Sequence, residues 1–174
     1  YLRLDAQVLP VLYETISPDV ACGFNVHRIG SRICLVATGY MVHTALKVAE
    51  RLASSGIDVG VIDIFNITGF DPERFQAVLQ PYAGIVSMEE GFRGRGGLDA
   101  MMFDFAGRRS IGAKILNIGV EGAYRFELGT RGDLHEQVGI GAASVEKAVT
   151  EFAKGLAIRP DFSGQRKRAV VEYN

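Results

Sequence analysis

The sequence predicts an α/β domain built around a mostly parallel sheet. Short, apolar, β-branched runs alternate with segments whose apolar residues recur at the helical period. Strands separated by helices imply right-handed βαβ units and helices on both faces of the sheet. The 174 residues, 48% hydrophobic and 22% charged, are enough to bury one core.

Four runs have the composition of buried parallel strands. They are residues 33–37, 59–64, 85–88 and 113–118. Residues 25–29 are short and mix polar with apolar side chains, which predicts an edge strand.

The first two helices have clear boundaries. The first places one apolar face inward and stops at Gly56. That face consists of Met41, Val42, Ala45, Leu46, Ala49 and Leu52. The second begins at Asp71-Pro72-Glu73, an N-cap carboxylate followed by proline and an acid in the first turn. Its apolar stripe is Phe75, Val78 and Leu79.

Two further helices are expected near the C-terminus. Thr130–Asp133 opens one that points Leu134 and Val138 inward and ends at Gly139. Ser144 is expected to cap the other. The residues sharing its inner face are Val145, Ala148, Val149 and Phe152.

The two ends fall outside this pattern. Residues 1–22 are expected to be the end of a preceding domain and a linker, since Tyr1–Leu4 alternates like the end of a strand. The domain itself spans 23–156, and 157–174 form a tail. The basic cluster Arg166–Arg168 predicts a solvated tail, with a targeting signal or partner-binding arm as the alternative.

Charge and hydropathy limit the kinds of partner that this chain is expected to bind. A net charge of −1 gives no general attraction to nucleic acid or anionic membrane. No apolar run reaches the roughly 20 residues of a membrane span, and no signal peptide is visible. A cytoplasmic protein is expected.

A glycine-dense loop follows the strand at 85–88. It does not fit the dinucleotide fingerprint, because a start at Gly94 puts Asp99 in the third glycine position. A start at Gly91 puts Arg93 in the second. The alternative is that Gly96 and Gly97 let the next helix pack tightly against the strand or a partner subunit.

Two adjacent carboxylates, Glu89 and Glu90, lead into this loop. Neighbouring residues of an extended backbone point to opposite faces, so the two are a poor acid/base pair. We expect one of them to anchor the loop through backbone N–H groups. A single catalytic carboxylate is the alternative.

The three histidines do not have metal-site spacing. His27 is expected to add polarity to the surface of the edge strand. His43 and His135 are expected to have surface or capping roles, with substrate contact as the alternative. Cys22 and Cys34 are too few for a disulfide framework, and Cys34 lies in an apolar run, which predicts a reduced core thiol.

The segment Leu98–Ala106 predicts a helix with more apolar surface than one face can bury. Met101, Met102, Phe103 and Phe105 all lie on it. Part of this surface is therefore expected to cover a partner.

Residues 23–153 resemble the C-terminal domain of the transketolase family of thiamine diphosphate enzymes. The matching segments come in the family's order. They are Ile29–Gly30, Ile33–Gly39 with Met41–Leu46, Val61–Ile64 with Phe70–Asp71, Val86–Gly91 with Gly96–Gly97, Arg125–Phe126 with Gly129, and Leu134–Ile140 with Ser144–Val149.

The resemblance implies a three-layer α/β/α sandwich with a five-stranded mixed sheet whose first strand is antiparallel. It also implies that thiamine diphosphate and Mg²⁺ bind elsewhere in the parent enzyme, because no Gly-Asp-Gly motif stands in this sequence. No catalytic, cofactor-binding or metal residue is then expected here. The partners implied are upstream pyrimidine-binding and diphosphate-binding domains or subunits, in a homodimer.

The parent would move a two-carbon ketol unit between sugar phosphates, or act as a 1-deoxy-D-xylulose-5-phosphate synthase. The residues expected at an interdomain or subunit interface are Glu89, Glu90, Gly91, Gly96, Gly97, Met101 and Met102. A histidine near the substrate would be His43 or His135. Two other classes stay open, a ligand-binding module that uses the Glu89–Gly97 loop and a pure assembly module.

Overall fold

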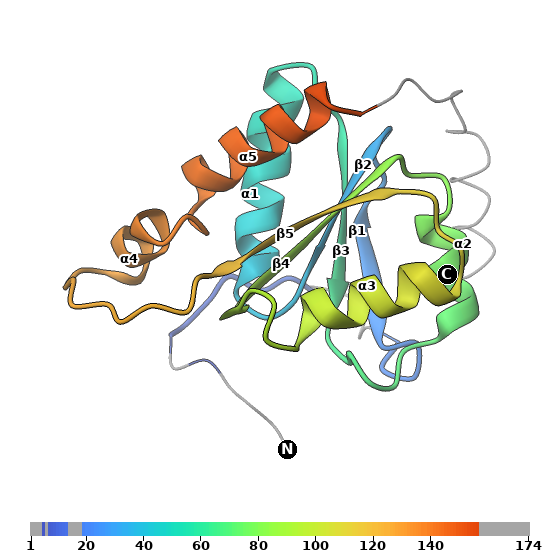
Figure 1. Cartoon of the computed structure of the whole chain (residues 1–174), viewed down its shortest axis with the longest axis horizontal. Helices are drawn as coiled ribbons and strands as arrows, with labels where there is room; N and C mark the ends of the chain where they lie inside the picture. The colour runs from blue at the N-terminus through green and yellow to red at the C-terminus, as the bar shows by residue number, and fades with distance from the viewer. Residues whose placement is uncertain (1–4, 6, 14–18, 157–174) are drawn as a thin grey trace.

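The computed structural model describes residues 5, 7–13 and 19–156. Within them, helices cover both faces of one sheet (Figure 1). The strands are β1 Phe24–Arg28, β2 Ile33–Ala37, β3 Val59–Ile64, β4 Gly84–Phe92 and β5 Lys114–Val120. The helices are α1 Met41–Ser54, α2 Pro72–Leu79, α3 Leu98–Arg108, α4 Arg131–Gln137 and α5 Ala142–Lys154.

The sheet has the order β1-β3-β2-β4-β5. Strand β1 pairs with β3 antiparallel, and every other pairing is parallel. The prediction of a five-stranded mixed sheet with an antiparallel first strand at its edge is therefore confirmed.

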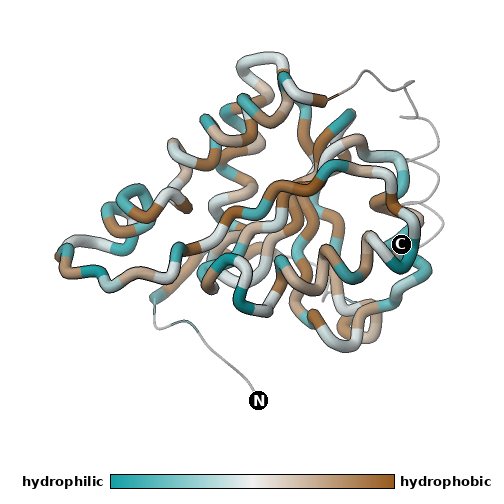
Figure 2. The backbone as a smooth tube through the Cα atoms, viewed as in Figure 1, coloured by the Kyte–Doolittle hydropathy of each residue, from teal (hydrophilic) through white to brown (hydrophobic). Residues whose placement is uncertain are grey.

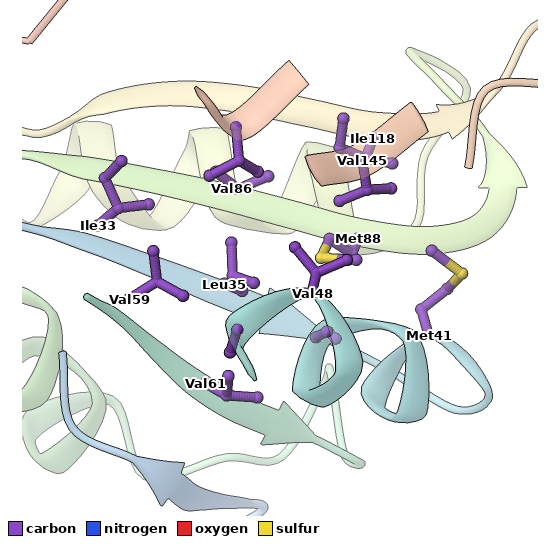
Figure 3. Close-up of a cluster of buried hydrophobic side chains, with 14 of the residues drawn as sticks. Ile33, Leu35, Met41, Val48, Val59, Val61, Val86, Met88, Ile118 and Val145 are labelled. Atoms are coloured by element: carbon purple, nitrogen blue, oxygen red, sulfur yellow. The ribbon is translucent and has the colours of Figure 1, made fainter. Parts of the chain in front are cut away.

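Alternation along the central strands builds two cores. On β2, Ile33, Leu35 and Ala37 join the side chains of α1 and α5 on one face (Figure 3). Cys34 and Val36 join those of α2 and α3 on the other. The strands form the hydrophobic centre of the molecule (Figure 2), so the three-layer prediction holds.

The first two helix boundaries lie where the sequence placed them. The Asp71 carboxylate accepts hydrogen bonds from the backbone N–H groups of Glu73 (3.1 Å) and Arg74 (3.0 Å) at the start of α2. Gly56 follows α1 with φ +77°, in the left-handed region that favours glycine.

The predicted cap of α5 is wrong. Gly141 is the N-cap residue, and Ser144 lies inside the helix. The Glu136 carboxylate from α4 takes the capping role, since it accepts from the N–H groups of Ala143 (2.8 Å) and Ser144 (3.0 Å). The Ser144 hydroxyl instead donates to Glu136.

Strand β4 is longer than predicted. It continues past Met88 to Phe92, through an irregularity in its pairing with β5 that ends where Phe92 meets Val120. Glu89 and Glu90 therefore belong to the strand itself.

Helix α3 divides its apolar residues between the core and solvent. Met102 is fully buried, which corrects its assignment to a partner interface. Phe105 is also buried and Met101 half-buried, whereas Phe103 is 55% exposed. The apolar surface that this helix leaves uncovered is mainly that of Phe103.

The end of α5 is tied to the amino edge of the sheet. Arg32, just before β2, donates to the carbonyl oxygen of Leu156 (2.8 Å). Lys114, the first residue of β5, donates to that of Gly155 (2.8 Å). Both cysteines are free and buried, as expected of core thiols. The predictions for Tyr1–Leu4 and for residues 157–174 lie outside the described residues.

None of the helices in the described part of the chain is long and apolar enough to span a membrane.

Candidate functional site

The site follows from the order of the strands. The helices that follow the neighbouring strands β2 and β4 lie on opposite faces of the sheet (Figure 1). Helix α1 follows β2 on one face, and α3 follows β4 on the other. In α/β sheets such a switch point leaves a crevice at the carboxyl ends of the strands, where ligands bind. The segment Thr38–Tyr40 and the end of β4 meet at this edge, and the Thr38 N–H donates to the Met88 carbonyl oxygen (3.3 Å).

Tyr40 lies at the centre of this edge. Its ring centroid is 6.1 Å from that of His43 and 5.2 Å from that of His135, which it meets edge-on. The Arg131 guanidinium lies 4.4 Å from the same centroid, a cation–π contact. Residues from α1 and α4 thus gather around one aromatic ring.

Glu90 supplies a negative charge beside His135 and Arg131. Its Oε1 lies 3.0 Å from Nε2 of His135 and 3.6 Å from Nε of Arg131. Arg131 also donates to the Asp5 carboxylate (2.7 Å) and to the Gln7 side chain (3.0 Å). We call Tyr40, His43, Glu90, Arg131 and His135 the crevice cluster.

The structure therefore brings both sequence-predicted histidines to one place. They line a cavity of about 180 Å³ with Tyr40, Lys47 and Glu136. Pockets that enclose a small-molecule ligand usually measure about 300–1,000 Å³. This cavity is too small to enclose a sugar phosphate, so by itself it can meet only one end of such a ligand.

Burial lowers the pKa of His43, against the opposing effect of the Asp63 and Asp5 carboxylates. The imidazole is therefore mainly neutral at pH 7, able to accept one hydrogen bond and donate another. Burial of the Glu136 carboxyl favours its neutral form, but hydrogen bonds from Ala143 and Ser144 outweigh it and lower the pKa.

Glu89 faces away from the crevice cluster, as expected for two adjacent strand residues. Its carboxylate is buried and accepts hydrogen bonds from the N–H groups of Leu98 (3.2 Å) and Asp99 (3.0 Å). The prediction that one glutamate anchors the loop is thus confirmed, and Glu89 is the residue. It lies inside the chain, which corrects its assignment to an interface.

The glycines of the loop make room for this carboxylate. A Cβ on Gly97 would lie 2.5 Å from Glu89 Oε2, and one on Gly91 2.8 Å from the same atom. Gly96 has no atom within 4 Å of such a Cβ, but its φ of +96° disfavours other residues. The loop lets α3 pack closely on β4.

His27 does not lie on the surface as predicted. Its ring packs 5.1 Å from that of Tyr13, and its side chain is 12% exposed. Tyr13 covers it and donates to the Asp63 carboxylate (2.6 Å). His27 Nε2 is 4.0 Å from Asp63 Oδ2. Edge-strand composition could not reveal a covering residue 14 positions earlier in the sequence.

The residues of this edge do not fit a diphosphate with its divalent metal. The N-terminus of α3, where a phosphate group could be bound, is filled by the Glu89 carboxylate. Within the described ranges, no three His, Cys, Asp or Glu side chains gather as metal ligands would.

Sequence reasoning missed Tyr40 and Arg131. Tyr40 precedes α1 without a side-chain capping bond, and Arg131 is simply the first residue of α4. Only their shared position at a switch point, known once the strand order is known, marks them as part of the site.

The fold and the site together define an α/β/α domain with a polar switch-point crevice and with the N-terminus of α3 filled by the Glu89 carboxylate. The chain belongs to the transketolase C-terminal domain family. The family model described as "Transketolase, C-terminal domain" matches residues 23–145.

Curated relatives include two kinds of enzyme. The 1-deoxy-D-xylulose-5-phosphate synthase of Aquifex aeolicus is 31% identical over 126 residues, covering 72% of this chain and 20% of the relative. One of the subunits of the apulose-4-phosphate transketolase of Actinobacillus succinogenes is 27% identical over 146 residues, covering 83% and 46%. The chain thus spans less than half the length of these relatives.

Two solved structures of transketolases have a similar fold. A split-gene transketolase, described as an inactive beta4 tetramer, superposes with a TM-score of 0.67 at 25% identity, covering 80% of this chain and 45% of that one. Transketolase from Campylobacter jejuni superposes with a TM-score of 0.62 at 19% identity, covering 83% and 21%, which shows the shared fold.

Proposed function

We propose that this chain is the C-terminal part of a thiamine diphosphate-dependent enzyme that transfers a two-carbon ketol unit between sugar phosphates. The observation that carries the proposal is the crevice cluster. Its members Tyr40, His43 and His135 line a cavity too small for a substrate, and Glu90 and Arg131 contact His135 and Tyr40. Such a site makes chemical sense as one wall of a larger pocket. Pyrimidine-binding and diphosphate-binding domains or subunits would supply the rest.

In this proposal thiamine diphosphate, held with Mg²⁺ by those other domains, supplies the carbanion chemistry. The residues of this chain position the substrate and hold the assembled domains together. The neutral His43 and the Glu90–His135 pair face the crevice, and Arg131 holds residues 5 and 7 against α4. Glu90, Gly91, Gly96 and Gly97 would meet a neighbouring domain at the sheet edge, with the half-buried Met101 beside them.

A 1-deoxy-D-xylulose-5-phosphate synthase parent is the alternative. The Aquifex aeolicus relative favours it, whereas the Actinobacillus succinogenes relative and the split-gene structure favour a transketolase made of separate chains. Either parent would work as a homodimer, and we expect it to be cytoplasmic, as this family generally is.

Calorimetry tests the division of labour. We expect no saturable binding of thiamine diphosphate and Mg²⁺ to the 174-residue chain at micromolar concentrations. Ketol transfer should appear when chains carrying the pyrimidine-binding and diphosphate-binding domains are added. Micromolar cofactor binding to the chain alone, or equal activity of the other chains without it, would overturn the proposal.

Arg131→Ala provides the matched variant in the reconstituted enzyme. We expect it to lower activity, since it removes contacts with Tyr40, Glu90 and residues 5 and 7. Arg108→Ala is the control, because Arg108 is an exposed arginine on α3 whose ion-pair partner among the described residues is Asp104.

A further inference from the structure

The connection between β5 and α4, residues 121–130, has features of an unpaired strand, and we call it the arm. It runs outward from the sheet before it turns back into α4 (Figure 1). Every residue in it is exposed. Tyr124, Phe126 and Leu128 are 93%, 87% and 94% exposed, unusual for three large apolar side chains so close together.

The spacing of these residues is that of a strand. In an extended backbone residues i, i+2 and i+4 point the same way, so as a paired strand Tyr124, Phe126 and Leu128 would form one apolar face. Arg125 and Glu127 would lie on the other. Neither of these two charged side chains has an ion pair with another described residue.

The backbone N–H groups in the middle of the arm, residues 124–129, also have few partners. Among the described residues, the only hydrogen bond from a backbone N–H within 124–129 is that of Phe126 to its neighbour Glu127 (3.0 Å). An unpaired backbone beside an apolar face is a template for strand addition.

We propose that the arm pairs antiparallel with the arm of a second copy of this chain, about a two-fold axis at Phe126. This register puts Tyr124 of each copy opposite Leu128 of the other and the two Phe126 rings opposite each other. On the reverse face Arg125 of each copy lies opposite Glu127 of the other, so both charge pairs are attractive. The arm is complementary to itself, as a two-fold interface requires.

The hydrogen-bonding pattern agrees with this register. If Phe126 occupies a non-hydrogen-bonded pair, Arg125 and Glu127 each exchange both backbone bonds with the residue opposite. The N–H groups used are then those without partners in the described structure, whereas the Phe126 N–H keeps its bond to Glu127. Non-hydrogen-bonded pairs also bring side chains closest, which suits the two phenyl rings.

This inference rests on the homodimer of the proposed function and names the contact that forms it. Sedimentation equilibrium of the full 174-residue chain and its charge reversals tests it. Arg125→Glu and Glu127→Arg each place like charges opposite one another in both symmetry-related pairs. We expect each to weaken dimerisation about tenfold or more.

An equimolar mixture of the two variants provides the decisive result. In the mixed dimer the glutamate introduced at position 125 of one copy faces the arginine introduced at position 127 of the other. The native Glu127 and Arg125 face each other in the second pair, so dimerisation should return to the level of the unaltered chain. Glu50→Arg on the exposed face of α1 is the control reversal, expected to leave dimerisation unchanged. Phe126→Ala should weaken the dimer, because each dimer loses two rings.

The arm pairing is overturned if Arg125→Glu and Glu127→Arg both dimerise as well as the Glu50→Arg control. It is also overturned if the mixture of the two variants does not regain the dimerisation of the unaltered chain. A chain that stays monomeric at every concentration overturns it too. The cofactor and reconstitution measurements described above decide the proposed function separately.

Discussion

The carboxylate of Glu89 on β4 accepts a hydrogen bond from the backbone N–H of Asp99 (3.0 Å), which joins the central sheet to the first turn of α3. It also accepts from Leu98, so one buried side chain satisfies two N–H groups that a helix terminus leaves free. Strand and helix are thereby fixed relative to each other across the glycine loop.

Replacing Glu89 with alanine should lower the free energy of unfolding by about 1–3 kcal/mol, because it leaves two buried donors unsatisfied. Urea denaturation measures this. Glu90→Ala is the matched control and should cost less, since Glu90 is partly exposed. Equal losses for the two variants would contradict the capping role.

Gly97→Ala should destabilise more than Gly96→Ala. Both residues have positive φ, +89° and +96°, so both substitutions carry backbone strain of order 1 kcal/mol. Only the new Cβ at 97 would meet Glu89 Oε2. The difference between the two should therefore shrink in the Glu89→Ala background, which a double-mutant cycle detects. An unchanged difference would disprove the contact.

Met102→Ala should cost about 2–5 kcal/mol because it opens a cavity in the core. Phe103→Ala, at the next position of the same helix, should stay within about 0.5 kcal/mol. Thermal or urea unfolding compares them. A small effect at Met102 would support its former assignment to a partner interface.

His43 should make stability depend on pH. Burial lowers its pKa in the folded state below the ordinary 6.5, so the unfolded chain takes up a proton first as pH falls. The resulting stability is present above pH 6.5 and is lost as pH falls through the folded-state pKa. The free energy of unfolding, measured with urea, should fall less steeply between about pH 7.5 and 5 for His43→Gln than for the unaltered chain. Identical slopes would exclude the effect, and a titration of the imidazole by NMR reads its pKa directly.

Arg131→Lys should fail to replace arginine. Lysine keeps the charge but not the planar group that reaches Asp5 and Gln7 while stacking on Tyr40. We expect faster hydrogen exchange in residues 7–13 for Arg131→Lys, and faster still for Arg131→Ala. Exchange as slow as in the unaltered chain would show that other contacts hold this segment.

Much of the fold could be predicted because its signals are local. Apolar runs such as Ile33–Ala37 became central strands, and Asp71-Pro72-Glu73 began a helix, since such residues favour these states wherever they lie. The antiparallel β1 came only from the family resemblance, and the strand order was not predicted at all, because pairing partners are not local.

The errors share one cause, which is contact between distant residues. Ser144 is a good cap by type, but the Glu136 carboxylate reaches the same helix end from α4. Tyr13 buries His27 from outside the sheet. The crevice cluster is assembled from α1, β4 and α4, so no spacing along the chain could reveal it.

The end of α5, which hydrogen bonds tie to the amino edge of the sheet, is a suitable place for a fluorescent label. Lys154 is exposed and directly precedes Gly155 and Leu156, whose carbonyl groups Lys114 and Arg32 hold, at the opposite end of the strands from Tyr40. Because both native thiols are buried, a cysteine placed at 154 should react alone with a maleimide dye. A dye there would report on the approach of other subunits while leaving the carboxyl edge of the sheet untouched.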